Sequence, residues 1–110
     1  MDIIQVASSS PKVSVLIRTT GRPSLLAAIN SVRNQRFGQW ELIVANASGN
    51  PLQPQESDGW SAIDKILEPG RALDRSAAAN LLLDACRGQY AIFLDDDDWF
   101  LEDHLEKLSH

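Results

Sequence analysis

Four consecutive aspartates at residues 95–98 are the side chains whose type and spacing most directly predict chemistry. Adjacent carboxylates repel one another and raise each other's pKa, so such a run is costly unless a cation or water offsets the repulsion. Hard divalent cations such as Mg²⁺ and Mn²⁺ prefer oxygen ligands, and they often bind through one or two carboxylates together with substrate phosphates. The run therefore predicts a cation site. The alternative is a solvated loop in which Asp98 stabilises the N-terminus of a following helix.

The elements that position these aspartates can be predicted from apolar patterns. Apolar, β-branched segments typical of strands buried on both faces lie at residues 13–17, 40–45 and 90–94. Helical spacing of apolar residues predicts three helices, the first with Pro23 at its first position, the second ended by Gly88 and the third after the aspartates. Residues 46–60 are typical of a long surface loop, and residues 61–67 are a weak candidate for one more short strand.

The alternation of strands and helices predicts an α/β fold in which a mostly parallel sheet lies between two helical layers. In open parallel sheets, ligands bind at the carboxyl ends of the strands. The aspartates follow the segment 90–94 directly, so they are expected at that edge.

Composition narrows the possible functions. The 110 residues are enough for one core, and the net charge of −5 argues against a nucleic-acid partner. No apolar stretch is long enough for a membrane helix, and no signal peptide is recognisable. Cys86 is the single cysteine, which excludes an intramolecular disulfide. We expect a flexible tail over residues 1–11, a domain over 12–110, and a cytoplasmic location, or one at the cytoplasmic face of a membrane within a larger enzyme.

Several other kinds of site are excluded by their motifs. The chain has neither a G-x-G-x-x-G sequence after its first strand nor a P-loop sequence, so dinucleotide and P-loop binding are not indicated. The aspartate run is not an EF-hand loop, because Phe100 stands where that loop requires glycine. A nucleotidyltransferase would need a glycine-rich basic loop after the first strand, which residues 19–23 match poorly. A phosphotransfer receiver domain is rejected because the first strand ends without acids.

A set of ordered motifs resembles a known family. The segments VSVLIRTTGRP (13–23), SVRNQRFGQWELIVA (31–45), AAAN (77–80) and GQYAIFLDDDDWF (88–100) follow in this order at suitable spacing. Together they resemble the amino-terminal half of family-2-type glycosyltransferases, which bind a nucleotide-sugar donor. The resemblance implies the Rossmann-like GT-A fold, represented here by its amino-terminal half only.

The resemblance also implies roles for individual residues. Arg18, Thr19 and Thr20 would contact the base, Asp95 or Asp96 would face the ribose, and Asp95 and Asp97 would hold Mn²⁺ or Mg²⁺ at the diphosphate. From their charge and position before the second predicted helix, and not from the resemblance, Arg71 or Arg75 would add a charge-assisted contact to a phosphate or the base. The alternative for either arginine is a surface side chain whose stem packs on the core. The implied reaction is metal-dependent transfer of a sugar, with inversion, from a nucleoside-diphosphate-sugar to a saccharide, lipid or protein acceptor.

Two departures from the family pattern leave an alternative open. Family members carry two aspartates after the second strand, where this chain has Ala45 and Asn46, and Thr20 and Gly21 replace a Tyr-Asn pair. The Asn46 amide can both donate to and accept from a base, whereas a carboxylate only accepts. The general base is expected in a carboxyl-terminal half beyond His110, so the 110 residues alone are predicted to be inactive. The alternative is a non-catalytic nucleotide-binding or assembly module, and an uncovered sheet would favour self-association.

Overall fold

The computed structural model describes residues 3–5, 11–52 and 58–108. Its centre is a five-stranded sheet with the order β1-β5-β2-β3-β4. The strands are β1 (Ile3–Gln5), β2 (Val13–Thr19), β3 (Trp40–Asn46), β4 (Lys65–Leu67) and β5 (Tyr90–Asp95). The helices are α1 (Leu25–Arg33), α2 (Arg75–Ala85) and α3 (His104–Leu108), with a 3₁₀ helix η1 (Asp58–Ala62).

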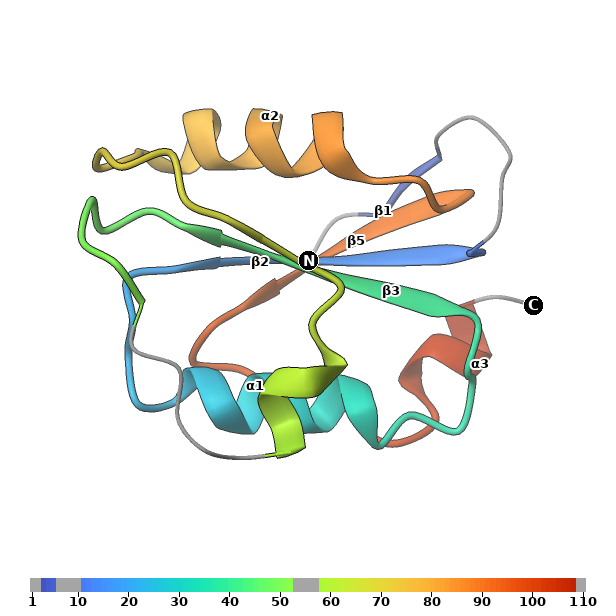
Figure 1. Cartoon of the computed structure of the whole chain (residues 1–110). Coiled ribbons are helices and arrows are strands. Elements are labelled where there is room, and N and C mark those ends of the chain that lie inside the picture. The colour runs from blue at the N-terminus through green and yellow to red at the C-terminus, as the bar shows by residue number, and fades with distance from the viewer. Residues whose placement is uncertain (1–2, 6–10, 53–57, 109–110) are drawn as a thin grey trace.

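Helices cover both faces of the sheet, as the sequence predicts. One face is covered by α2, and the other by α1, α3 and η1 (Figure 1). Neighbouring residues of β2 serve the two layers in turn, because Val15 and Ile17 pack in the α1 layer while Leu16 packs beneath α2. This alternation is why the strand is apolar throughout. The predicted three-layer, mostly parallel α/β fold is confirmed.

The parallel register brings three strand ends to one edge of the sheet. Thr19, the last residue of β2, lies opposite Asn46, the last residue of β3. Arg18 lies opposite Asp95, where β5 ends. The aspartates therefore lie at the carboxyl-end edge, where ligands of open parallel sheets bind.

The first helix begins later than predicted. Its N-cap is Ser24 and its first residue is Leu25, so Pro23 lies in the preceding turn and not at the first helical position. The reason is local, since Gly21 has a φ of 90° and the Leu25 N–H donates to the Arg22 carbonyl at 3.0 Å, which closes a turn ahead of the helix. The helix α2 is capped by Asp74, whose side chain accepts from the Ala77 N–H at 2.8 Å.

Two short strands also differ from expectation. Within the segment predicted as a flexible tail, Ile3–Gln5 form β1 and pair antiparallel with β5, because that strand's outer edge has backbone groups to satisfy. Residues 1–2 and 6–10 of the predicted tail lie outside the described residues. The candidate strand at 61–67 is shorter than predicted, since its first residues belong to η1 and only Lys65–Leu67 pair with β3.

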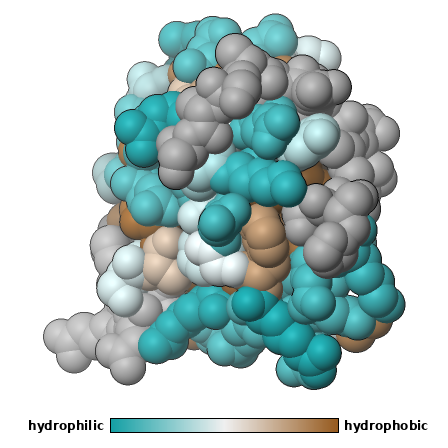
Figure 2. Space-filling model, turned by 90° about the vertical axis from the view of Figure 1, so that its right-hand side faces the viewer, coloured by the Kyte–Doolittle hydropathy of each residue, from teal (hydrophilic) through white to brown (hydrophobic). Residues whose placement is uncertain are grey.

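The amino ends of the strands are joined by a buried polar network. The Glu41 carboxylate accepts from the Ser14 hydroxyl at 2.5 Å and from the Arg87 N–H at 2.6 Å. The Gly88 N–H donates to the Ser14 hydroxyl at 2.8 Å. Figure 2 views this side of the molecule, where hydrophobic residues form small patches among hydrophilic ones. No helix in the described part of the chain is both long and apolar enough to cross a membrane.

Candidate functional site

The four aspartates do not share one environment. The strand β5 ends at Asp95, and the Asp98 N–H donates back to the Asp95 carbonyl at 3.1 Å, so the run forms a single tight turn. Asp96 points inward and is only 7% exposed, whereas Asp95, Asp97 and Asp98 are exposed. Because the carboxylates lie in different environments, the repulsion that makes such a run costly is reduced.

Asp96 is held by the end of the neighbouring strand. The buried Thr19 hydroxyl donates to Asp96 Oδ2 at 2.8 Å and accepts from the Gly21 N–H at 3.0 Å. The polar atoms of Thr19 and one oxygen of Asp96 are therefore engaged in fixing the turn against β2. The contacts with a base and a ribose that resemblance implies for these two residues stay predictions.

A cation that the sequence pattern does not single out lies beside the run. Arg22 Nη1 donates to Asp97 Oδ2 at 3.2 Å, and Arg22 Nε lies 3.9 Å from Asp96 Oδ1. The sequence gives little indication of this contact, because Arg22 and Asp97 are 75 residues apart. Only the parallel pairing of β2 with β5 brings them together.

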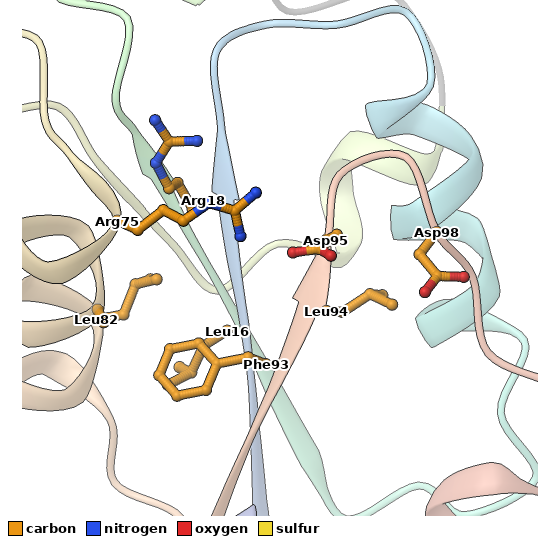
Figure 3. Close-up of a pocket in the computed structure, with 9 residues that line it drawn as sticks. Leu16, Arg18, Arg75, Leu82, Phe93, Leu94, Asp95 and Asp98 are labelled. Atoms are coloured by element: carbon orange, nitrogen blue, oxygen red, sulfur yellow. The ribbon is translucent and has the colours of Figure 1, made fainter. Parts of the chain in front are cut away.

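A pocket of about 360 Å³ opens on the α2 side of this edge. It brings together three residues predicted for the site, Arg18, Arg75 and Asp95 (Figure 3). In that view the two arginines lie on one side, and the Asp95 carboxylate at the tip of β5 points towards them. The remaining lining residues are Leu16, Ala79, Leu82, Phe93, Leu94 and Asp98.

The two arginines retain hydrogen-bonding capacity. Arg18 Nη2 donates to the Leu73 carbonyl at 3.2 Å, but Arg18 Nε is buried without a hydrogen-bond partner. Arg75 is exposed at the start of α2 and forms no ion pair with the residues that the structure describes. A buried donor without a partner is uncommon in folded proteins, and an anionic group in the pocket would satisfy it.

Asn46 is buried and its amide is already saturated. Its Nδ2 donates to the Asn50 carbonyl at 2.5 Å and to Glu68 Oε2 at 3.1 Å. Its Oδ1 accepts from the Ser48 N–H at 3.0 Å and from the Ser48 hydroxyl at 2.7 Å. The residue therefore closes the loop after β3, and the predicted contact between Asn46 and a base would require some of these bonds to break.

The exposed residues that complete the predicted site do not line the pocket. Thr20 and Arg71 are exposed and are not among the residues that line it, and the same is true of Asp97, which is paired with Arg22. Within residues 3–5, 11–52 and 58–108, no three His, Cys, Asp or Glu side chains converge as a complete metal site. Asp95 and Asp97 still offer exposed carboxylate oxygens, which suit Mg²⁺ or Mn²⁺ when phosphates and water complete the coordination.

Comparison with known proteins identifies the family. Residues 14–109 match the family described as "Glycosyl transferase family 2". The chain belongs to this family. Among curated proteins, this glycosyl transferase family 2 chain is 33% identical over 104 residues to the GalNAc(5)-diNAcBac-PP-undecaprenol beta-1,3-glucosyltransferase of Campylobacter jejuni subsp. jejuni serotype O:2. It is 26% identical over 99 residues to the uncharacterized glycosyltransferase YwdF of Bacillus subtilis (strain 168).

Solved structures show the same fold. The chain superimposes on S. aureus TarS 1-349 with a TM-score of 0.75 at 18% identity, covering 89% of this chain and 31% of TarS 1-349. Its TM-score with TarS 1-349 in complex with UDP-GlcNAc is 0.72 at 17% identity, with 89% and 30% covered. The two curated relatives are matched over 89% of this chain and over 33% and 37% of their own lengths. The family 2 chain thus spans about a third of the proteins it resembles.

Proposed function

We propose that this glycosyl transferase family 2 chain binds a nucleoside-diphosphate-sugar at the carboxyl ends of β2 and β5. We further propose that transfer of the sugar is metal-dependent and inverts the anomeric carbon. The observation that carries the proposal is the pocket that brings Arg18, Arg75 and Asp95 together beside the aspartate turn. The UDP-GlcNAc complex of TarS, which has the same fold, supports a donor of this class.

Each side of the pocket suits a different part of such a donor. The guanidinium groups of Arg18 and Arg75 offer charge-assisted hydrogen bonds to phosphate oxygens, and Arg18 Nε lacks any other partner. The half-buried side chain of Phe93 lines the same pocket and offers an apolar surface for a nucleobase or ribose. Since the Asn46 amide is saturated, we place the base contacts on the β2 side of the edge, near Arg18.

The aspartate turn suits the leaving diphosphate. Asp95 and Asp97 expose oxygens that would hold a divalent cation, and Asp96 fixes the turn through Thr19 so that these oxygens keep their places. Such a cation, when bound, offsets the charge that develops on the departing nucleoside diphosphate. Arg75 is free to move towards a phosphate, because it is exposed at the first residue of α2 and has no ion pair within the described residues.

The direct test is calorimetric titration of UDP, GDP and their sugars, with and without Mn²⁺. We expect metal-dependent binding that is lost in Asp97→Ala and retained in Asp84→Ala. The control residue is also an exposed aspartate, on α2, but it is not among the residues that line the pocket. The absence of binding by a folded chain for every nucleotide tested, or equal losses in the two variants, would contradict a donor site centred on the aspartates.

One observation favours a second function, which is nucleotide binding without transfer. The position at which family members carry an aspartate is occupied by Asn46, and its four hydrogen bonds turn it into a loop-closing residue. Radiolabelled donor incubated with a panel of saccharide, lipid and protein acceptors separates the two functions. A glycosylated acceptor supports transfer, whereas nucleotide binding that neither depends on Mn²⁺ nor is lost in Asp97→Ala supports the module.

A further inference from the structure

Arg22 places a guanidinium group against the aspartate turn. Its Nη1 lies 3.2 Å from Asp97 Oδ2 and its Nε lies 3.9 Å from Asp96 Oδ1. We propose that Arg22 is a built-in counter-cation of the turn, which must leave Asp97 before a divalent cation binds there. The proposal rests on the proposed function for the identity of the cation. It adds a residue that controls when the metal enters.

The backbone of Arg22 is anchored, so only its side chain can move. The Arg22 carbonyl accepts from the Leu25 N–H at 3.0 Å, which ties the residue to the start of α1. On its other side, the Gly21 N–H donates to the Thr19 hydroxyl, which in turn holds Asp96. The segment that fixes the aspartate turn therefore also places the Arg22 guanidinium beside that turn.

The ion pair between Arg22 and Asp97 is weak enough for a divalent cation to replace the guanidinium. The side chains of Arg22 and Asp97 are 55% and 57% exposed, and exposed pairs of this kind contribute little because water screens them. Asp96 differs, because its side chain is only 10% exposed and its Oδ2 is held by Thr19. Removing Arg22 from Asp97 therefore frees one carboxylate without disturbing the buried contact that keeps the turn in place.

Competition between the two cations has a consequence for the order of binding. A divalent cation that arrives alone must displace the guanidinium from Asp97 and leave it next to a new positive charge without that partner. A cation that arrives with a nucleoside diphosphate brings phosphate oxygens, which offer the displaced guanidinium a new partner. Arg22 thus weakens the binding of metal alone more than the binding of metal with nucleotide, and it couples the two ligands.

The test measures Mn²⁺ binding to the chain from the electron paramagnetic resonance signal of free Mn²⁺. We expect Arg22→Gln to bind Mn²⁺ about two- to fivefold more tightly than the unaltered chain, the range set by the strength of exposed ion pairs. Arg22→Lys keeps the charge and should bind Mn²⁺ nearly as weakly as the unaltered chain. With UDP present, the gain of the Arg22→Gln variant should shrink. Tighter metal binding is a gain that impaired folding does not produce.

Arg33→Gln is the matched control, because it removes the same charge from an exposed arginine in the last turn of α1. Arg33 forms no ion pair with the aspartates of the turn or with any other residue that the structure describes, so its replacement should leave the Mn²⁺ affinity unchanged. Equal Mn²⁺ affinities for Arg22→Gln and the unaltered chain, an equal gain in Arg33→Gln, or no Mn²⁺ binding by any variant overturns the proposal. Metal-dependent donor binding in the calorimetric titration is independent of the first two outcomes, and in the third it would show that Mn²⁺ binds only together with the nucleotide, so the two proposals fail separately.

Discussion

Asp96 and Asp97 are adjacent and chemically identical, yet they should respond very differently to the same substitution. Asp96→Ala removes a buried hydrogen bond between a carboxylate and the Thr19 hydroxyl, 2.8 Å long. Bonds to charged groups contribute about 1.5–3 kcal/mol to the free energy of unfolding. Asp97→Ala removes only an exposed ion pair with Arg22, which contributes about 0–1 kcal/mol.

Removing one carboxylate also relieves repulsion among the remaining aspartates, which partly offsets the decrease in the free energy of unfolding. This relief acts in both variants, so it cancels in part when the two are compared. The expected difference between them is about 2 kcal/mol, with Asp96→Ala the less stable. For a domain of this size it corresponds to a difference in Tm of about 8–16 °C. Asp97→Ala should instead be the variant that loses Mn²⁺.

The assay is urea unfolding followed by tryptophan fluorescence, with the free energies of unfolding extrapolated to water. Thr19→Val in a double-mutant cycle with Asp96→Ala isolates the bond itself, and we expect a coupling energy of about 1–2 kcal/mol. Equal stability of the Asp96 and Asp97 variants, or a coupling energy near zero, would refute the division of the run into one buried carboxylate and three exposed ones.

Three further outcomes test other parts of the molecule. Gly88→Ala should lower the free energy of unfolding by about 2–3 kcal/mol in urea, because an added Cβ would lie 2.6 Å from the Ser14 nitrogen; an unaltered midpoint would contradict the close approach. Asn46→Asp should destabilise the chain by about 2–3 kcal/mol at pH 7 and less at acidic pH, because it replaces a donor to Glu68 with a second carboxylate. Burial, and then the charge of Glu41, raises the pKa of the Cys86 thiol, so iodoacetamide should modify it more slowly in the folded chain than in urea at pH 8; equal rates would count against its burial.

The layers of the fold could be predicted because their signals are local. Segments 13–17, 40–45 and 90–94 are apolar on both faces, and each lies within a strand of the sheet. Their alternation with helices then limits the topology to a parallel sheet. Strand β1 could not be predicted in this way, since three residues carry no periodicity and their pairing with β5 spans most of the chain.

The candidate site could be predicted only at the level of strand ends. A run of four aspartates after a buried strand marks the edge of the sheet, and the pocket there includes Asp95. Four identical residues give no indication of which one turns inward, because that depends on the Thr19 hydroxyl 77 residues earlier. The saturation of Asn46 depends likewise on Glu68, 22 residues later. The other three bonds of Asn46 are local, to Ser48 and Asn50, so only the bonds to Thr19 and Glu68 lie beyond what residue spacing encodes.

The three strand ends at this edge differ in whether their polar groups already have hydrogen-bond partners. The end of β3 is closed, because Asn46 binds its own loop and Glu68 with all four of its hydrogen-bonding positions. The ends of β2 and β5 remain open, with an unpartnered Arg18 Nε on one and exposed carboxylates on the other. A ligand that neutralises both the arginine and the carboxylates must lie across the ends of β2 and β5. It must carry negative charge towards Arg18 and a cation towards Asp95. A diphosphate accompanied by a metal has this distribution of charge, whereas a simple anion or a lone metal satisfies only one side.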